Sequence, residues 1–135
     1  MIGVLVVTHG SIGEALVSSA AQILGSSPQQ VATLSVWRQD DPDDLVLRAR
    51  ELLDGLDAGD GVLVLTDIFG ATPGNVVSRL LQDGKVEGVS GVSLPMLLRV
   101  LTSRDGALAA AVERARSGGA EGVVHMNTDS CGAKR

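Results

Sequence analysis

The chain has 135 residues, 44% of them hydrophobic and 20% charged, a size and composition that suit one globular domain and leave no room for a second. Its 11 Lys and Arg against 16 Asp and Glu give a formal net charge of -5, which excludes the basic excess that nucleic-acid binding requires. A single cysteine, Cys131, excludes an internal disulfide. The apolar runs are short and no signal-peptide pattern is present, which predicts a soluble, cytoplasmic protein with no membrane insertion.

The first predicted element is a buried strand. Residues 2–7 are continuously apolar and mostly β-branched, which is typical of a strand covered by helices on both faces, and His9 follows directly. Ser11 and Glu14 match a capping box, which predicts a helix over residues 11–25.

The next elements repeat this alternation. Residues 31–37 alternate between apolar and polar side chains and predict a second strand. Asp41 and Pro42 supply an N-cap and a first-turn proline for a second helix. Residues 61–66 form another apolar run, which predicts a third buried strand.

The second half of the chain continues in the same order. Thr72 is the expected N-cap of a third helix, which Gly84 ends. Residues 86–93 predict a fourth strand, Pro95 opens a short helix, and residues 106–116 predict a last helix.

The C-terminal region is expected to leave the helical pattern. Gly118 and Gly119 are expected to break the last helix, and residues 122–126 predict a fifth strand. The domain therefore covers residues 1–126, and residues 127–135 form a polar tail.

Alternating strands and helices predict one α/β domain. We expect a doubly wound, three-layer fold with a mostly parallel sheet of order 2-1-3-4 and right-handed crossovers. In such folds the functional crevice lies beyond the carboxyl ends of the strands, where the winding direction reverses. This rule brings His9, after the first strand, close to residues 67–72, after the third.

Three features of that crevice could take part in a reaction or bind a ligand. His9 can act as a nucleophile, a base or a metal ligand, or it is a loop histidine without a special role. Asp67 can accept a hydrogen bond from the ring and fix the outward nitrogen, or it is a turn or capping residue. The loop over residues 70–73 offers backbone N–H groups and a hydroxyl to an anion. Together they indicate phosphoryl transfer to imidazole, and the absence of a Walker motif excludes a P-loop.

Three motifs carry a resemblance to a known family. They are the stretch that ends at His9, the stretch LTDIFGATPGN over residues 65–75, and the stretch LPML over residues 94–97. In this order and at this spacing, over residues 1–126, the chain resembles the IIA component of the mannose-type sugar phosphotransferase system. The resemblance implies that His9 accepts a phosphoryl group from the phosphocarrier HPr and passes it to a separate IIB component for sugar uptake. It also implies a homodimer that exchanges C-terminal strands, and no metal or other cofactor.

The resemblance also implies a role for each residue of the site. His9 would be phosphorylated on Nε2, and Asp67 would hold Nδ1. The phosphoryl group would be bound by Gly10, Ala71 and Thr72. The loop after the third strand would be shaped by Phe69, Gly70, Pro73 and Asn75. Phe69 and Ser93 depart from the residues common in the family, Trp and Asn, which bears on the IIB partner and the sugar.

Other functions stay open. A regulatory phosphocarrier would use the same His9 to signal to a partner protein. The phosphocarrier subunit of dihydroxyacetone kinase has a similar first strand and histidine, but residues 72–73 and 94–96 resemble the mannose type. A small metallochelatase would need a second histidine beside His9, and only His125 is available for it.

The other polar residues that stand out in the sequence are expected to have structural or surface roles rather than a place in the site. His125 is expected at a surface or dimer interface, and four clustered aspartates at residues 40–44 are expected to be charges at a helix start. Arg38, Arg99 and Arg104 follow strand or helix ends, where they could steer a phosphate or a partner; we interpret them as solvated surface residues.

Overall fold

A four-stranded parallel sheet forms the centre of the computed structural model, which describes residues 1–128. Residues 129–135, with Cys131 and most of the expected tail, lie outside the described residues. The strands are β1 (Gly3–His9), β2 (Val31–Val36), β3 (Val62–Thr66) and β4 (Val86–Ser90). Their order is β2-β1-β3-β4, all pairs are parallel, and the predicted order 2-1-3-4 is confirmed.

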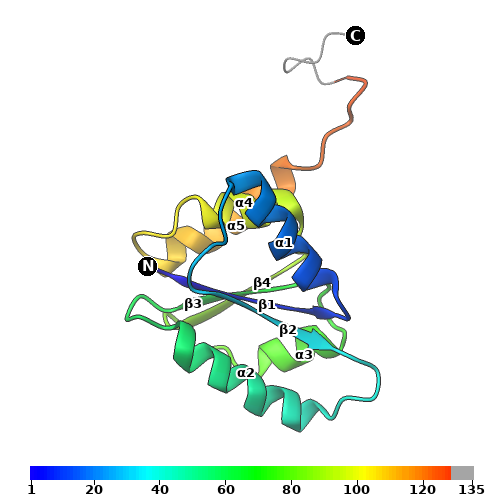
Figure 1. Ribbon diagram of the computed structural model, residues 1–135, viewed down its shortest axis with the longest axis vertical. Helices are drawn as coiled ribbons and strands as arrows, with labels where there is room; N and C mark the ends of the chain where they lie inside the picture. The colour runs from blue at the N-terminus through cyan, green and yellow to red at the C-terminus, as the bar shows by residue number, and fades with distance from the viewer. Residues whose placement is uncertain (129–135) are drawn as a thin grey trace.

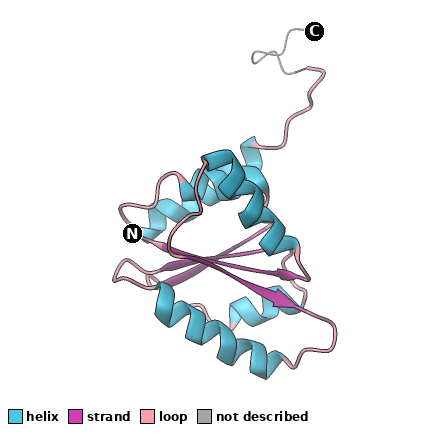
Figure 2. Ribbon diagram, viewed as in Figure 1, coloured by secondary structure: helices cyan, strands magenta, loops and turns pink. Residues whose placement is uncertain are grey.

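Helices cover both faces of the sheet, as the predicted three-layer architecture requires (Figure 1; Figure 2). One face is covered by α1 (Ile12–Leu24), α4 (Leu94–Leu101) and α5 (Leu108–Glu121). The other face is covered by α2 (Pro42–Leu56) and α3 (Thr72–Ser78). Because β1 and β3 are neighbours from which the chain turns in opposite directions, the loops after them meet at the switch point.

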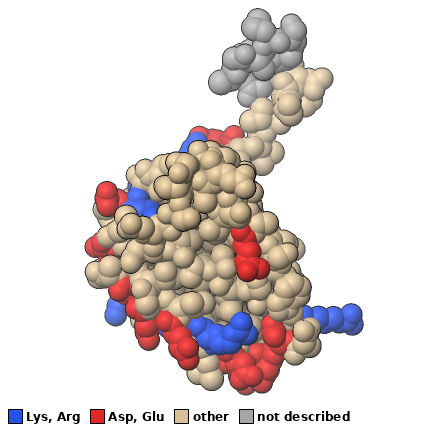
Figure 3. All heavy atoms as spheres, in the orientation of Figure 1, with Lys and Arg blue, Asp and Glu red and all other residues tan. Residues whose placement is uncertain are grey.

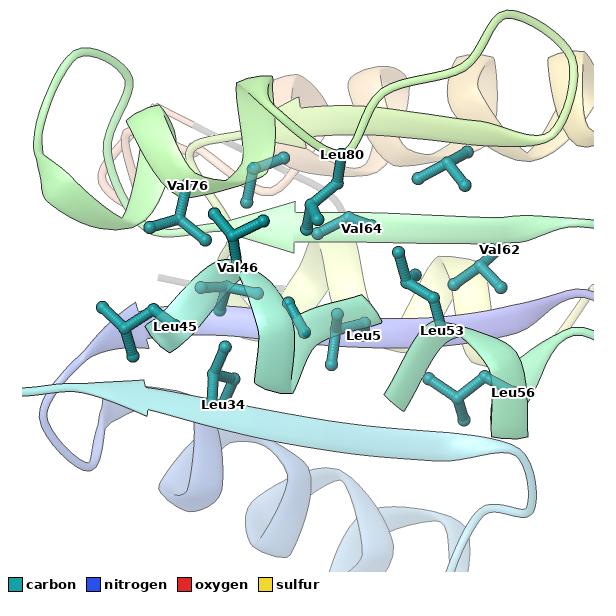
Figure 4. Packing of buried hydrophobic residues seen from close by; sticks show 14 of the residues in the cluster. Leu5, Leu34, Leu45, Val46, Leu53, Leu56, Val62, Val64, Val76 and Leu80 are labelled. Atoms are coloured by element: carbon teal, nitrogen blue, oxygen red, sulfur yellow. The ribbon is translucent and has the colours of Figure 1, made fainter. Parts of the chain in front are cut away.

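Alternate residues of the buried strands supply two separate apolar cores. Leu5 of β1 and Val64 of β3 face α2, where they pack with Leu45 and Leu53 (Figure 4). Their neighbours in the strands face α1, α4 and α5 instead. Successive side chains of a strand point to opposite faces, so a continuous apolar run is what a sheet covered on both sides requires.

The C-terminal region differs from the expectation. Helix α5 runs through Gly118 and Gly119 to Glu121, so these glycines do not break it. A Cβ on Gly118 would lie 3.0 Å from Cβ of Arg99, so glycine permits α5 to pack closely against α4. The prediction of a fifth strand over residues 122–126 is wrong for the single chain, since these residues lie beyond α5 without strand structure and extend from the body of the domain (Figure 1).

Two helix starts also differ from the sequence prediction. Ser11 occupies the N-cap of α1, but its side chain makes no capping hydrogen bond, and the Gly13 N–H donates instead to Thr8 Oγ1 at 2.8 Å. The predicted capping box is therefore wrong. At α3 the N-cap is Ala71 rather than Thr72, which is the first helical residue.

Two element ends are earlier than predicted. Helix α3 ends at Ser78, because the N–H groups of Arg79 and Leu80 bond to carbonyls three residues back rather than four. Strand β4 ends at Ser90, before Gly91, whose φ of 81° takes the backbone out of the extended conformation. Within residues 1–128 no helix is long and apolar enough to cross a membrane.

Candidate functional site

The site lies at the carboxyl edge of the sheet. His9 is the last residue of β1, and Asp67 follows β3, the strand paired with β1 on that side. Ring Nδ1 of His9 lies 2.8 Å from Oδ2 of Asp67, and the backbone N–H of His9 donates to the same oxygen at 3.1 Å. The imidazole remains 49% exposed, so the ring is fixed on one side and open to solvent on the other.

Asp67 is held as a carboxylate. Burial raises its pKa, but the hydrogen bonds from the ring and backbone of His9, together with the charge of His9, outweigh burial, and the pKa lies below its usual range. Its second oxygen, Oδ1, accepts from the Ile68 N–H at 3.1 Å and from Thr66 Oγ1 at 3.4 Å.

The charge of Asp67 determines the tautomer of His9. A carboxylate only accepts hydrogen bonds, so ring Nδ1 carries the proton. In the neutral ring the lone pair is then on Nε2, which makes no hydrogen bond within residues 1–128. In its neutral form the ring therefore has a free lone pair on Nε2, which is the form of histidine that acts as a nucleophile or a metal ligand.

A cavity of about 500 Å³ adjoins His9. Thr72 lines it from the start of α3. The remaining lining residues come from the end of β2, the loop that follows and the first residue of α2: Val36, Trp37, Arg38, Asp40 and Pro42. The Trp37 ring packs beside Gly10, where an added Cβ would lie 3.2 Å from the ring. Gly10 also has a φ of 50°, so this position favours glycine for both its conformation and its space.

The loop after β3 has a mixed exposure. Phe69 is 81% exposed, and Gly70 has a φ of 89°. Ala71 is half-buried, and its carbonyl accepts the N–H of Asn75 at 2.8 Å as α3 begins. Pro73 is buried, so it anchors the first turn of α3 to the domain.

The structure thus places only some of the predicted site residues beside His9. It brings His9, Asp67 and Thr72 to one edge of the sheet, with Gly10 beside them. The exposed side chains of Phe69 and Asn75 do not line the His9 cavity.

Trp37 was not predicted as a site residue. The signal that points to it is the strand order, because β2 flanks β1 and its last residue, Val36, pairs with His9. The residue after β2 must therefore lie beside the loop that follows β1.

Three further residues considered in the sequence analysis, His125, Arg99 and Arg104, either lie away from His9 or have partners of their own. His125 is exposed in the segment beyond α5, contacts Thr128, and does not line the His9 cavity. Arg99 pairs with Glu121 at 2.8 Å. For Arg104, both the steering role and the interpretation as a solvated surface residue are wrong. Its side chain is only 7% exposed and donates to the carbonyls of Ile2 and Gln30 at the opposite edge of the sheet.

The clustered aspartates serve the start of α2. Asp41 Oδ1 accepts the Asp43 N–H at 3.0 Å, as expected of an N-cap, and Asp40 Oδ2 accepts the Trp37 N–H at 2.8 Å. Asp43 pairs with Arg79 at 2.9 Å. Among the described residues no group of three or more His, Cys, Asp or Glu side chains gathers as a metal site.

Comparison with known proteins assigns the family. Residues 3–115 match the family model EIIA-man, described as the PTS system fructose IIA component. The chain belongs to this family. The predicted resemblance to mannose-type IIA components of the sugar phosphotransferase system is thereby confirmed.

Curated relatives agree with this IIA assignment. The chain is 32% identical over 124 residues to the PTS system mannose-specific EIIAB component of Escherichia coli (strain K12), covering 87% of this chain and 38% of the relative's length. It is 31% identical over 106 residues to the PTS system fructose-specific EIIA component of Bacillus subtilis (strain 168), covering 78% of this chain and 72% of that protein. It also matches 10% of the transcriptional regulatory protein LevR of Bacillus subtilis (strain 168), at 28% identity over 76% of this chain.

Solved structures of IIA components have the same fold. The crystal structure of phosphotransferase system component EIIA from Streptococcus agalactiae superposes with a TM-score of 0.85 and 28% identity, covering 96% of this chain and all of that one. The carboxyl-edge location of His9 and Asp67 therefore belongs to a fold shared with IIA components.

Proposed function

We propose that this IIA component is a phosphohistidine carrier: His9 accepts a phosphoryl group from HPr and passes it to a separate IIB component that serves sugar uptake. The observation that carries the proposal is the contact of 2.8 Å between His9 Nδ1 and Asp67, which places the lone pair of the neutral ring on Nε2, in a side chain that is 49% exposed and lines a cavity. The chain spans 38% of the length of the mannose-specific EIIAB relative, and the transfer to IIB is part of this proposal. We place this activity in the cytoplasm, in a domain over residues 1–126 with residues 127–135 as a tail.

The transfer step follows from the tautomer. The Nε2 lone pair of neutral His9 attacks the phosphorus in line, a new P–N bond forms, and the P–N bond to the donor histidine breaks. The electron pair of the broken bond returns to the donor ring, which leaves as neutral imidazole. Phosphorylated His9 then has a positively charged ring, whose Nδ1–H donates to the negative Asp67. No proton has to move. A second in-line transfer delivers the phosphoryl group to IIB: a nucleophile of IIB attacks the phosphorus, the P–N bond to His9 breaks, and its electron pair returns to Nε2.

Binding of the phosphoryl oxygens is assigned to the loops beside His9. In this proposal the backbone N–H of Ala71 and the N–H and hydroxyl of Thr72 donate to the oxygens, which need donors as negative charge spreads over them. The Gly10 N–H already donates to the Val36 carbonyl at 2.9 Å, so the part proposed for Gly10 is to leave space for the phosphoryl group beside His9. Thr72 lines the cavity beside His9, which supports its part. A second group keeps the loop in shape: Phe69, Gly70, Pro73 and Asn75.

A partner surface surrounds the same edge. The exposed apolar side chains Ile12, Trp37, Ile68 and Phe69 lie in or next to the loops that follow β1, β2 and β3. Exposed apolar groups of this kind are typical of a binding surface for another protein. We assign this surface to HPr and IIB.

The homodimer is proposed on separate evidence. β4 is an edge strand, and a cavity of about 610 Å³ beside it is lined by its residues and by α4 and α5. Val123 and Met126 beyond α5 are 85% and 78% exposed. Exchange of residues 122–126 between two copies would cover both the edge strand and these side chains.

A second function has one observation in its favour. The match to LevR, a transcriptional regulatory protein, shows that a related segment occurs in a regulator. In this alternative His9 is phosphorylated in the same way, and the phosphorylation state is recognised by a regulatory partner instead of IIB. The chelatase alternative gains nothing comparable, because His125 does not line the cavity of His9.

Intact-mass spectrometry at neutral or alkaline pH tests the proposal, since phosphohistidine is acid-labile. The protein is mixed with enzyme I, HPr and phosphoenolpyruvate, and one added phosphate is expected. His9→Ala should acquire none, and His125→Ala, which changes the other histidine, should acquire one. Phosphate on His9→Ala, or none on the wild type with active enzyme I and HPr, would contradict the proposal. Transfer from the phosphorylated protein to IIB then separates transport from regulation.

A further inference from the structure

The surroundings of His9 are poor in positive charge. Four loops follow the strands at the carboxyl edge, and they comprise residues 10–11, 37–41, 67–71 and 91–93. Their ionisable side chains are Arg38 and the three aspartates Asp40, Asp41 and Asp67. A phosphoryl group brings further negative charge, and its transfer places that charge on three equatorial oxygens. A nearby cation would stabilise both the bound group and the transition state.

Arg38 is the only lysine or arginine in these four loops. Its side chain is exposed, lines the same cavity as His9 and Thr72, and makes no hydrogen bond or ion pair within residues 1–128. Arg99 and Arg79, in contrast, already have carboxylate partners. Figure 3 shows Lys and Arg side chains as scattered groups among acidic ones on the face of the molecule in view.

The backbone of this loop is held in place. Trp37 and Asp40 close a tight turn, because the Asp40 N–H donates to the Trp37 carbonyl at 3.0 Å and the Trp37 N–H donates to Asp40 Oδ2 at 2.8 Å. Arg38 occupies the second position of that turn. The Gly10 N–H donates to the Val36 carbonyl at 2.9 Å, which fixes the end of β2 to the residue after His9. A flexible side chain therefore starts from a fixed point next to the reacting ring.

We propose that Arg38 is a catalytic residue whose guanidinium binds the oxygens of the phosphoryl group as it arrives at, and while it remains on, Nε2 of His9. The inference rests on the proposed function and adds to it the group that neutralises the phosphate. The guanidinium forms and breaks only hydrogen bonds; the P–N bonds exchange between the two rings as described above. An arginine suits this task because its planar fork matches two phosphoryl oxygens.

The test compares two phosphoryl donors of different size. Phosphorylated HPr contacts the surface around His9, whereas phosphoramidate, a small chemical donor, presents only its phosphoryl group. Arg38→Gln should lower the rate of His9 phosphorylation about ten- to hundredfold with both donors, the loss expected for one hydrogen bond to a charged group. Arg38→Lys should recover part of the rate, since it restores the charge without the fork. Arg48→Gln is the matched control, because Arg48 is exposed on α2, also lacks a carboxylate partner within residues 1–128, and does not line the His9 cavity.

The outcomes separate this inference from the proposed function. An unchanged rate for Arg38→Gln with both donors, while the wild type is phosphorylated normally, would overturn the inference alone. Slower phosphorylation from HPr only would also overturn it and would assign Arg38 to protein docking. If the wild type accepts phosphate from neither donor, the proposed function itself fails. Circular dichroism of the variants checks that each is folded.

Discussion

One oxygen of Asp67, Oδ2, accepts hydrogen bonds from both the ring and the backbone of His9. The backbone bond fixes the carboxylate to the end of β1, and the ring bond then fixes the imidazole relative to the same strand. Ring orientation is thus determined by the pairing of β1 with β3 rather than by the rotamer of a free loop side chain. This relationship makes Asp67 the residue through which the sheet positions the reacting nitrogen.

Replacing Asp67 by Asn should slow phosphorylation of His9 about ten- to hundredfold. An amide that turns its NH₂ toward the ring would favour the proton on Nε2, and one that turns its oxygen there would point NH₂ at the Ile68 N–H and Thr66 hydroxyl. The rate is measured by intact mass, and nitrogen NMR of His9 reports the tautomer. An unchanged rate would show that Asp67 is only structural.

Stability should fall in acid partly through Asp67. Its pKa is lower in the folded chain than its ordinary value of 3.8, so its stabilising contribution is present above that value and is lost as the pH falls through the folded pKa. We expect the urea midpoint of Asp67→Asn to depend less steeply on pH below about 4 than that of the wild type. Asp83→Asn, whose exposed carboxylate lies in a turn and accepts no hydrogen bond among residues 1–128, should keep the wild-type slope. Equal slopes for both variants would refute the assignment.

The N-caps of α2 and α1 should contribute differently to the free energy of unfolding. Asp41→Ala should lower the free energy of unfolding by about 1 kcal/mol, because the side chain caps α2 through the Asp43 N–H. Ser11→Ala should have an effect within about 0.5 kcal/mol, since the Ser11 side chain makes no capping bond. Urea denaturation of both variants measures the difference, and a larger loss for Ser11→Ala would contradict the described start of α1.

Two leucines of α2 offer a matched test of the core. Leu45 is fully buried between α2 and the sheet, and Leu45→Ala should cost about 2–5 kcal/mol of unfolding free energy. Leu47 lies on the same helix but is 59% exposed, so Leu47→Ala should change it by less than about 0.5 kcal/mol. Similar losses for the two variants would mean that α2 is packed differently from the arrangement described here.

The strand order and the meeting of His9 with Asp67 could be predicted because both depend on long, regular patterns. Buried parallel strands produce continuous apolar runs, and the switch-point rule then places the residues after the first and third strands together. No side-chain detail is needed for this step.

The details that could not be predicted depend on contacts between distant residues. Thr8 replaces Ser11 as the acceptor at the start of α1, and this contact becomes visible only once the strand and helix are packed. Gly118 and Gly119 resemble helix breakers locally, yet the close approach of α4 gives them a packing role that outweighs their low helix propensity. Arg104 is buried because it satisfies carbonyls of Ile2 and Gln30, which lie far from it in sequence.

The contact of Trp37 with Gly10 has a practical consequence. Trp37 is the only tryptophan of the chain, and its ring lies against the residue that follows the reacting histidine. The indole is half exposed, so its emission responds to charge and solvent at that edge of the sheet. The protein therefore contains a single intrinsic fluorophore at its site, through which phosphorylation and partner binding can be followed without a label.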